Sequence, residues 1–341
     1  MYAILCHPGH NRVYFEQSKK FSVNELTIAA SRMQADIGGI GLKSVAGISY
    51  VMFESGDELA ESDLKILGQL SFAFALYKYR DGIFKPVELP PFGFIDPNIS
   101  RILKYAGKTN EVFTRLMINT AIFSSDFALT GDIRLLDPIA GKGTTLFEGL
   151  ACGYDVYGIE IGENAVTEAY HFLKKYLEKE KYKHQVKLEK QSGSNKSFTA
   201  QRYRFSISKS KEAAKENLFR EFELIAGSSV HAASFYKKNH FNMIVGDLPY
   251  GVQHGSVTNQ KQSSLTRNPK ELLTACLPAW KDVLKSNGII ALSWNTFVLS
   301  KKELSKLLED NGFEIFCGDS YNFEHRVDQA INRDIVVARK V

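Results

Sequence analysis

The sequence has few cysteines, and none is placed for a disulfide framework or a zinc site. Its four cysteines lie far apart in 341 residues, and no Cys-x-x-Cys pair occurs among them. This spacing argues against a disulfide-stapled fold and against a structural zinc site. We therefore expect reduced thiols in a cytoplasmic protein without a bound metal.

Long apolar runs are also missing, and no basic leader precedes the short apolar stretch at the amino terminus, Tyr2–Cys6. Apolar residues make up 44% of the chain and charged residues 24%, which is typical of soluble globular proteins. We therefore expect neither a signal peptide nor a membrane anchor. The sequence shows no internal repeat, and its length suits about two domains.

The net charge of +5 is concentrated in one segment. Lys174–Lys211 holds 12 lysines and arginines against three glutamates, with five tyrosines and phenylalanines interleaved, so the rest of the chain is slightly acidic. Such a segment suits phosphates and unpaired bases, although a solvated surface is the other interpretation. From it we predict Lys187, Arg202 and Arg204 as substrate contacts.

The pattern of predicted elements changes near residue 95. Residues 1–95 predict a small α+β, ferredoxin-like domain with a capping box at Ser22–Glu25, a linker at 86–93, and strands at 2–6, 48–53 and 71–79. Residues 96–341 alternate strands and helices and predict a Rossmann-like α/β domain with a seven-stranded, mostly parallel sheet whose last strand is antiparallel. Within it, the basic segment predicts an inserted hairpin at about 179–221.

A glycine-rich turn follows the first predicted strand of the second domain. It reads Asp137-Pro138-Ile139-Ala140-Gly141-Lys142-Gly143-Thr144, and its two glycines let the backbone approach a ligand closely. Glu160 ends the next strand, 23 residues after Asp137, where an acid can accept the hydroxyls of a ribose. Together, the turn and the acid predict a nucleoside-bearing cofactor at this edge of the sheet.

S-adenosylmethionine suits this turn better than ATP or a nicotinamide cofactor. A P-loop requires Gly, four residues and then Gly-Lys-Ser/Thr, a frame that the turn lacks. A dinucleotide turn would have a third glycine where Leu146 stands. The predicted cofactor residues are Asp137, Pro138, Ala140, Gly141, Gly143, Thr144, Glu160, Ile161, Ser228, Ser229 and Asp247.

The stretch Asp247-Leu248-Pro249-Tyr250-Gly251 follows an apolar run that predicts a buried strand. Its acid and a carbonyl of Leu248 or Pro249 can accept the two hydrogens of an exocyclic amine, while Tyr250 can stack on the ring that carries it. A plain turn at the end of a strand is the other interpretation. We predict as catalytic residues Asp247, Leu248, Pro249 and Tyr250, and as further substrate contacts Gly251, Gln253, His254 and Arg267.

With these motifs in this order, the chain resembles the class I S-adenosylmethionine-dependent methyltransferases that modify exocyclic amines of nucleic-acid bases. It is most similar to the THUMP-associated tRNA and ribosomal RNA guanine-N2 methyltransferases, the group that includes the tRNA guanosine-10 enzymes. Their glycine turn reads Asp-Pro-x-x-Gly-x-Gly-Thr, which this sequence matches from Asp137 to Thr144, and the resemblance covers about 107 to 341. Leu248 stands where the family has the first proline of Asp-Pro-Pro-Tyr, and Gly227–Ser229 stand where many relatives have an acid.

The resemblance implies an S-adenosylmethionine-dependent RNA methyltransferase that acts on guanine N2, with tRNA favoured over ribosomal RNA. It also implies a THUMP-related RNA-binding domain in residues 1–95, which are shorter than the usual ferredoxin-like and THUMP pair. Two other functions stay open. One is adenine-N6 methylation of RNA or DNA by the same motif, and the other is a noncatalytic RNA-binding protein that retains the fold.

Overall fold

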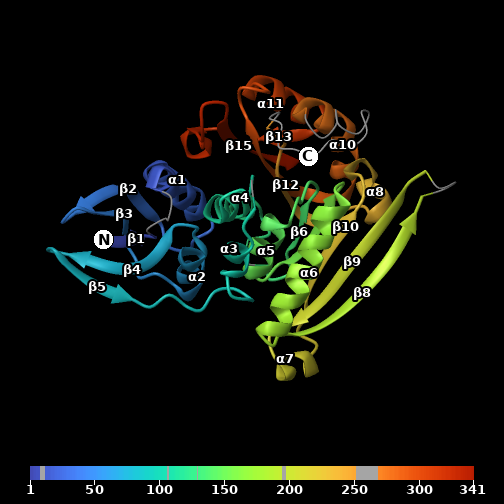
Figure 1. Cartoon of the computed structure of the whole chain (residues 1–341). Helices are drawn as coiled ribbons and strands as arrows, with labels where there is room; N and C mark the ends of the chain where they lie inside the picture. The colour runs from blue at the N-terminus through green and yellow to red at the C-terminus, as the bar shows by residue number, and fades with distance from the viewer. Residues whose placement is uncertain (8–11, 106, 129, 194–196, 251–267) are drawn as a thin grey trace.

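The structure is a computed structural model that describes residues 1–7, 12–105, 107–128, 130–193, 197–250 and 268–341. Two β-sheets organise these residues, the first within residues 2–87 and the second within residues 134–340 (Figure 1). The second sheet confirms the α/β, Rossmann-like fold expected from the sequence. In the described part of the chain, no helix combines the length and the apolar character needed to cross a bilayer. The four cysteines are all free thiols.

The first sheet is antiparallel, and its strand order is β2-β3-β1-β4-β5. Its elements follow one another as strand, helix, strand, strand, helix, strand, the chain order of ferredoxin-like folds, with one more strand at the edge. The elements are β1 (Tyr2–Cys6), α1 (Arg12–Ala30), β2 (Ile37–Val45), β3 (Ile48–Ser55), α2 (Glu61–Gln69), β4 (Ala73–Arg80) and β5 (Ile83–Val87).

Two strands of this sheet, β2 and β5, are absent from the sequence prediction. Two-residue turns with positive φ at both positions join them to their neighbours, at Ala46–Gly47 and Asp81–Gly82, and turns of this kind match the twist of a hairpin. The predicted linker at 86–93 is wrong at its start, because Pro86 pairs with Tyr77 inside β5. An edge strand tolerates a proline because one side of it needs no hydrogen-bond partner.

The predicted capping box at Ser22–Glu25 is also wrong, because these residues lie inside α1 rather than at its start. The Ser22 hydroxyl donates to the carbonyl of Ser18 one turn earlier, at 2.9 Å. Serine inside a helix commonly bonds back in this way. Glu25 points into the interior of the molecule, where it contributes to the junction described below.

The second sheet has ten strands rather than the predicted seven, because the hairpin β8–β9 extends its edge and the short β14 pairs with β15. The order of the other strands is β13-β15-β12-β11-β6-β7-β10-β9-β8. Strands β10, β7, β6, β11 and β12 run parallel, and the last strand, β15, is antiparallel to its neighbours as expected. The strands are β6 (Arg134–Asp137), β7 (Asp155–Glu160), β8 (Lys183–Ser192), β9 (Thr199–Ser208), β10 (Arg220–Ala226), β11 (Phe241–Asp247), β12 (Leu284–Asn295), β13 (Phe313–Ile315), β14 (His325–Arg326) and β15 (Asn332–Lys340).

Helices cover both faces of this sheet. Along β11, Met243 and Val245 belong to the core beneath α4 and α5, whereas Ile244 between them belongs to the core beneath α10 and α11. Burial on both faces explains why this strand is an unbroken apolar run. The helices are α3 (Ile99–Ile102), α4 (Glu111–Phe123), α5 (Thr144–Ala151), α6 (Glu163–Lys179), α7 (Lys211–Lys215), α8 (Ala232–Phe235), α10 (Pro269–Val283) and α11 (Lys301–Asp310).

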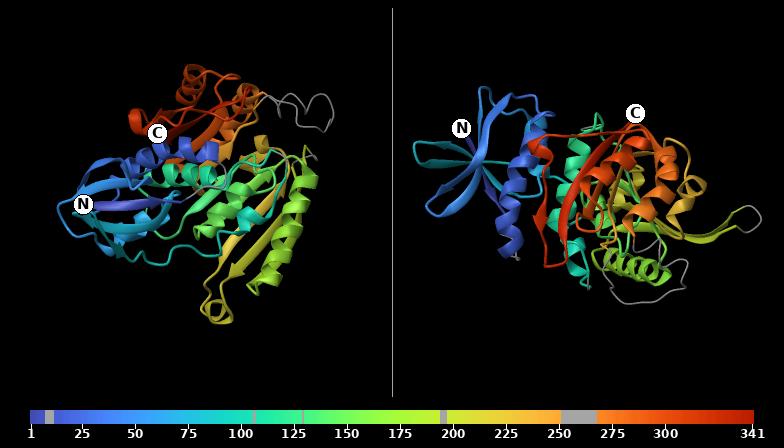
Figure 2. Two further views of the ribbon diagram at one scale, coloured as in Figure 1. Left: turned by 60° about the vertical axis from the view of Figure 1, so that its left-hand side comes forward. Right: turned by 90° about the horizontal axis from the view of Figure 1, so that it is seen from above.

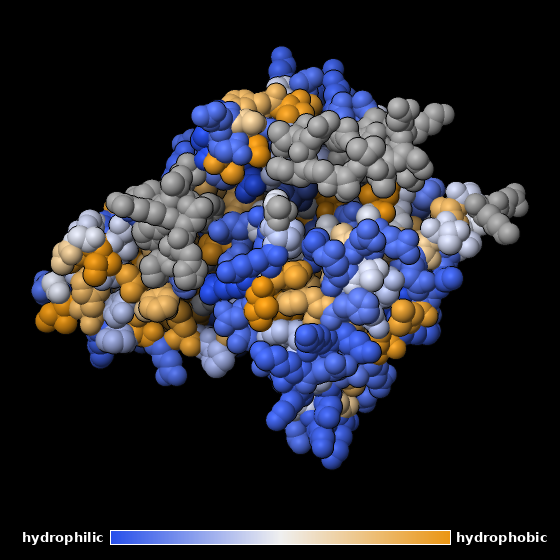
Figure 3. Space-filling view, in the orientation of Figure 1, coloured by the Kyte–Doolittle hydropathy of each residue, from blue (hydrophilic) through white to orange (hydrophobic). Residues whose placement is uncertain are grey.

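The basic segment lies at the end of the second sheet that is farthest from the first sheet (Figures 1 and 2). It comprises the end of α6 and the hairpin β8–β9, and α7 begins where it ends. The predicted hairpin at about 179–221 is therefore present, although its strands take only part of that range. Figure 3 shows hydrophilic side chains gathered over α6 and α7.

Helix α4 joins the two sheets into one apolar core. Ile4 and Phe53 of the first sheet, Met117 of α4 and Val156 of the second sheet all belong to the same buried cluster. Figures 1 and 2 show that helices, α4 among them, fill the space between the two sheets. Rotation of one sheet against the other would therefore expose apolar surface to water.

A buried polar network crosses this junction. Asn119 of α4 donates to the Glu25 carboxylate at 2.6 Å and to the carbonyl of Gln69 at 2.8 Å. The Gln69 amide donates to the Tyr154 hydroxyl at 2.6 Å, and Ser71 donates to Glu25 through its amide at 2.9 Å and its hydroxyl at 2.5 Å. Glu25 is fully buried, and this burial raises its pKa to about 7.

We expect Glu25→Gln to remove part of the pH dependence of stability. The pKa of Glu25 in the fold, about 7, lies above its ordinary value of 4.5. Its contribution to stability is therefore complete below about pH 4.5 and is lost as the pH rises through about 7. Glutamine keeps an acceptor for Asn119 and gains a donor toward the Ser71 hydroxyl, so the variant should gain melting temperature over the wild type as the pH rises.

Calorimetric melting temperatures between about pH 5 and pH 8 measure this difference. Glu88→Gln, at an exposed glutamate, is the matched control and should follow the wild type. A constant difference between Glu25→Gln and the wild type across this range would show that Glu25 does not titrate there.

Candidate active site

The carboxyl ends of four parallel strands meet at one edge of the second sheet. Asp137 ends β6, Glu160 ends β7, Ala226 ends β10 and Asp247 ends β11. Adjacent strands are in register there, since Ala226 pairs with Glu160. Ligands of open α/β sheets bind at this edge, so residues that are far apart in the sequence form one candidate site.

Two glycines shape the turn after β6. Gly141 has φ of +53° and Gly143 has φ of +89°, a conformation that glycine adopts without strain. A Cβ on Gly143 would lie 3.4 Å from the ring of Phe147, whereas one on Gly141 would meet no atom within 4 Å. The amide of Ala140 donates to the carbonyl of Ile159 at 2.9 Å and ties the turn to β7. Gly141 therefore borders open space just before α5.

Glu160 is held by the backbone on both sides. Its Oε2 accepts from the amide of Gly141 at 2.9 Å, and its Oε1 accepts from the amide of Gly162 at 2.7 Å. Burial raises the pKa of Glu160, and the backbone hydrogen bonds oppose that rise. Each carboxylate oxygen can accept a further hydrogen bond, so Glu160 keeps capacity for two hydroxyl groups.

A cavity of about 210 Å³ opens between these strand ends. The predicted residues that line it are Pro138, Glu160, Ile161, Ser228, Ser229, Asp247 and Pro249. The lining residues that the sequence prediction misses are Ile139, Ile159, Val230, Leu272 and Cys276. Two carboxylates in an otherwise largely apolar wall suit a flat heterocycle with polar substituents.

Five predicted cofactor residues of the turn do not line this cavity, namely Asp137, Ala140, Gly141, Gly143 and Thr144. Asp137 is buried, its Oδ1 accepts from the amide of Ile139 at 3.1 Å, and burial raises its pKa to about 7. The hydroxyls of Thr144 and Tyr105 are 2.9 Å apart, which joins the start of α5 to the segment before α4. Ala140 is buried as well. These residues fix the shape of the turn.

The two predicted serines after β10 differ in what their side chains contact. The Ser229 hydroxyl accepts from the indole nitrogen of Trp280 at 2.9 Å, and both residues are buried. Ser228 is only half-buried and borders the cavity. Ser229 therefore supports the cavity wall by anchoring α10.

Three hydroxyl groups surround the carboxylate of Asp247. Thr109 donates to Oδ2 at 2.5 Å, and Ser293 donates to Oδ1 at 2.6 Å. The Tyr250 hydroxyl lies 2.6 Å from Oδ1 and 2.7 Å from Oδ2. These donors come from the segment before α4, from β12 and from the strand end itself, and they fix the direction of the carboxylate.

The residues after Asp247 are fixed by β12 and by the core. The amide of Leu248 donates to the carbonyl of Ser293 at 2.8 Å, and the Leu248 side chain is 1% exposed. Leu248 therefore contributes packing where the resembled family has a proline, while Pro249 lines the cavity.

Tyr250 is covered on one side by Arg333. The guanidinium lies 5.0 Å from the centre of the Tyr250 ring and 4.8 Å from that of Phe113. Burial raises the pKa of Tyr250 well above its ordinary value, so its hydroxyl stays protonated and donates to Asp247. The ring predicted to stack on a base is thus turned toward the predicted catalytic acid.

The remaining predicted substrate contacts fall into two groups. Lys187, Arg202 and Arg204 lie on the hairpin β8–β9, where they line a different and larger groove. Four others are outside the described residues, namely Gly251, Gln253, His254 and Arg267.

Three residues that contact this site are missed by sequence reasoning. Ser293 pairs with Asp247 near the end of β12, so the strand-end rule was a sufficient signal for it. Thr109 lies in a segment before α4 that has no chemical motif. Arg333 lies on β15, where it pairs with Asn295 of β12. No local sequence pattern indicates its role.

Comparisons with known proteins give one family and a set of distant structures. A family model described as UPF0020, RMKL-like, methyltransferase domain, matches residues 124–323. A search of curated proteins finds no match.

Three of the similar solved structures illustrate the range. A Pyrococcus horikoshii protein provisionally described as an RNA methyltransferase is 11% identical over 72% of this chain and 94% of its own, with a TM-score of 0.41. The magnesium protoporphyrin IX methyltransferase of Synechocystis PCC 6803 is 14% identical over 72% and 90%, with a TM-score of 0.37. An S-adenosylmethionine-dependent methyltransferase of Methanosarcina mazei is 16% identical over 62% and 94%, with a TM-score of 0.36.

Ser229→Ala and Ser228→Ala should differ in stability, because only Ser229 supports the cavity wall through a hydrogen bond. Ser229→Ala leaves the buried indole N–H of Trp280 without its acceptor, and an unsatisfied buried donor costs about 1–3 kcal/mol. We therefore expect urea denaturation to give a lower free energy of unfolding by about that amount, with Ser228→Ala close to the wild type. Equal stability of the two variants would contradict the supporting role of Ser229.

Proposed function

The chain belongs to the UPF0020 family of RMKL-like methyltransferase domains, and on that premise we propose that it methylates an exocyclic base amine in RNA, with guanine N2 in tRNA as its preferred target. Membership of this family means that the protein is an S-adenosylmethionine-dependent methyltransferase. The base and the RNA are our proposal.

The residues at the strand ends fit S-adenosylmethionine. Glu160 borders the cavity with spare acceptor capacity for the ribose hydroxyls. The open space beside Gly141 would admit the amino-acid part, and the apolar wall with Ile139 and Leu272 suits the adenine ring. When bound, this cofactor supplies an electrophilic methyl group on a sulfonium.

The observation that carries the proposal is the carboxylate of Asp247 at the cavity. Its hydrogen-bond partners are neutral hydroxyls, so its negative charge is oriented without being neutralised. An aromatic amine is a weak nucleophile because its lone pair is delocalised into the ring. By accepting an amine hydrogen, Asp247 would localise that lone pair and then receive the proton that the nitrogen loses, a role worth about 10²–10⁴-fold in rate.

Tyr250 competes with the base amine for Asp247. Its hydroxyl takes both carboxylate oxygens, so an amine must displace it to be held there. The displaced ring can then stack on the base. The base must first leave its position in the RNA stack, which costs a few kcal/mol. The side chain would thus exchange a hydrogen bond for a stacking contact when substrate binds.

The preference for guanine N2 in tRNA rests on the motif order and the glycine turn shared with the resembled family. Adenine N6 is an amine of the same kind, and the Asp247 site would hold it by the same contacts. Mass spectrometry of nucleosides after incubation of RNA with labelled cofactor distinguishes the two by retention and mass. A noncatalytic RNA-binding protein would yield neither product.

Asp247→Ala should mainly impair methyl transfer, whereas Glu160→Ala should mainly impair cofactor binding. We expect Asp247→Ala to lower methyl transfer by at least about 10²-fold, with a smaller loss of cofactor affinity. Glu160→Ala should weaken cofactor binding by about 10–100-fold, since hydrogen bonds to a charged group contribute about 1.5–3 kcal/mol. Calorimetric titration with S-adenosylmethionine and a radiolabelled methyl-transfer assay measure the two effects, and full activity of Asp247→Ala would refute the assigned role.

Tyr250→Phe and Tyr250→Ala should separate the ring from the hydroxyl. Phenylalanine keeps the stacking surface and removes the group that competes for Asp247, so KM for RNA should stay equal or fall. Alanine removes the surface, and stacking is worth about 1–3 kcal/mol per base, so KM should rise about 10–100-fold. If Tyr250→Phe raises KM for RNA as much as Tyr250→Ala does, the hydroxyl rather than the ring acts on the substrate.

A further inference from the structure

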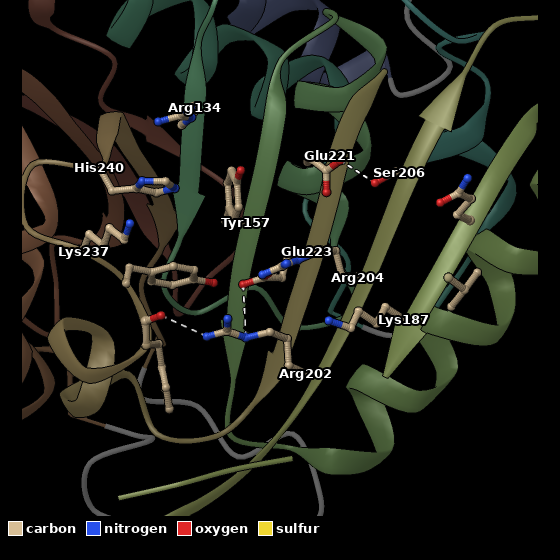
Figure 4. Close-up of a pocket in the computed structure, with 14 residues that line it drawn as sticks. Arg134, Tyr157, Lys187, Arg202, Arg204, Ser206, Glu221, Glu223, Lys237 and His240 are labelled. Carbon is tan, nitrogen blue, oxygen red and sulfur yellow. Dashed lines mark hydrogen bonds and ion pairs between the residues drawn. The ribbon is translucent and has the colours of Figure 1, made fainter. Parts of the chain in front are cut away.

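A second large concavity lies on the hairpin β8–β9. Helix α6 covers one face of these strands, where Tyr170 packs on Tyr203 and Phe205. On the opposite face, β8, β9 and β10 form a groove of about 940 Å³ (Figure 4). We call it the hairpin groove, and its lining includes Lys187, Arg202, Arg204, Glu223, Tyr236 and Lys237.

One buried acid and two arginines form the floor of the hairpin groove. Glu223 is fully buried and lies 2.7 Å from Arg204 and 3.5 Å from Arg202. Arg202 also donates to the carbonyl of Phe235 at 2.9 Å, and its guanidinium lies 5.7 Å from the centre of the Tyr236 ring. Figure 4 shows the arginines projecting from β9 toward Glu223 on β10. The acid fixes both cations but neutralises only one.

Three buried polar atoms of the floor have hydrogen-bonding capacity to spare. Arg202 Nε and Glu223 Oε1 face each other as an ion pair at 3.5 Å, and neither they nor the Tyr236 hydroxyl make a hydrogen bond of good geometry within the described residues. Each such atom costs about 1–3 kcal/mol if it stays unsatisfied. A polar ligand at the floor can use this spare capacity.

The rim of the groove is positively charged. Its further cations are Arg134 of β6, Lys187 of β8 and Lys237 of the loop after α8 (Figure 4). The whole lining has five lysines and arginines against two glutamates. His240 adds a ring rather than a charge, because burial lowers its pKa to about 4. The groove therefore favours an anionic ligand.

An adjoining cavity connects the hairpin groove to the candidate active site. This cavity, of about 570 Å³, shares Phe235 with the groove and shares Ile161 and Ser228 with the active-site cavity. Aromatic rings border it, with Phe198 stacked on His231 at 4.5 Å between centres. The path follows β10, whose residues advance about 3.3 Å each, so the floor at Glu223 lies roughly 10 Å along the strand from its end at Ala226.

From this geometry we infer that the hairpin groove binds an unpaired segment of the RNA substrate and leads it toward the active site. The inference rests on the proposed function for its choice of RNA. Cations along a groove with intervening rings form the pattern of single-strand binding, in which phosphates meet the charges and bases stack. Glu223 and Arg202 lie deep in the groove, with 1% and 14% of their side chains exposed, so a flexible single strand fits the groove better than a rigid duplex.

Charge reversal at the rim tests the inference without touching the floor. Lys187→Glu with Lys237→Glu replaces two exposed lysines of the groove. The matched control is Lys211→Glu with Lys215→Glu, which makes the same change in net charge on the exposed surface of α7. Labelled polyuridine, which forms no duplex, is titrated by fluorescence anisotropy at several salt concentrations.

We expect the groove variant to bind polyuridine at least about tenfold more weakly than the wild type. The slope of log affinity against log salt should fall in magnitude by about 0.7 for each phosphate that the groove no longer neutralises. The control should match the wild type, an RNA duplex should bind more weakly than polyuridine, and polyglutamate should not compete.

Three results would overturn the inference. They are wild-type affinity of the groove variant, tighter binding of the duplex, and displacement of polyuridine by polyglutamate, which would indicate an acidic protein partner. Methyl transfer is measured separately on the same proteins. Binding of polyuridine in the groove without transfer to any RNA would refute the proposed function alone, whereas transfer with unchanged binding in the groove variant would refute the groove alone.

Discussion

The hydrogen bonds that hold the carboxylate of Asp247 are the interaction on which the candidate site depends. Their donors, Thr109, Tyr250 and Ser293, come from three distant parts of the chain. All three are hydroxyls, and within the described residues Asp247 has no ion pair. Charge-assisted hydrogen bonds of this kind orient an acid strongly, yet they leave it a negative charge to offer to an amine. A lysine or arginine in the same place would compete with the substrate for that charge.

Glu160 uses a different solution to the same problem of placing an acid in a cavity. Backbone amides of Gly141 and Gly162 hold it, so its position depends on the turn rather than on other side chains. The two acids therefore respond differently to mutation. Changes in distant elements can disturb Asp247, whereas only changes in the glycine turn or the end of β7 can disturb Glu160.

Much of the second sheet could be predicted from sequence because its signals are local. Apolar runs marked the parallel strands, and the rule that polar residues at strand ends gather at one edge brought Asp137, Glu160 and Asp247 together. The alternation within the basic segment was enough to predict the hairpin. These features depend on residues that are close in the sequence, so they could be predicted without knowledge of distant contacts.

The features that could not be predicted arise from contacts between distant residues. The Ser229 hydroxyl accepts from Trp280, 51 positions away, while Ser229 also borders the cavity. Arg333 covers one face of the Tyr250 ring, and the Tyr250 hydroxyl bonds Asp247. Neither contact had a local signal. The spacing at Ser22–Glu25 suited a helix cap, although the helix had begun earlier. There a local pattern was compatible with two environments, and packing selected one.

The common core around α4 also has a consequence for how the protein meets a large substrate. Met117 and its neighbours belong to the cores of both sheets, so the two cannot separate without exposing apolar surface. The two sheets therefore keep a fixed relative position, unlike two domains joined by a flexible linker. If the substrate is RNA, as we propose, a molecule that touches both the first sheet and the active site would have to match this fixed distance, so its shape would contribute to selection.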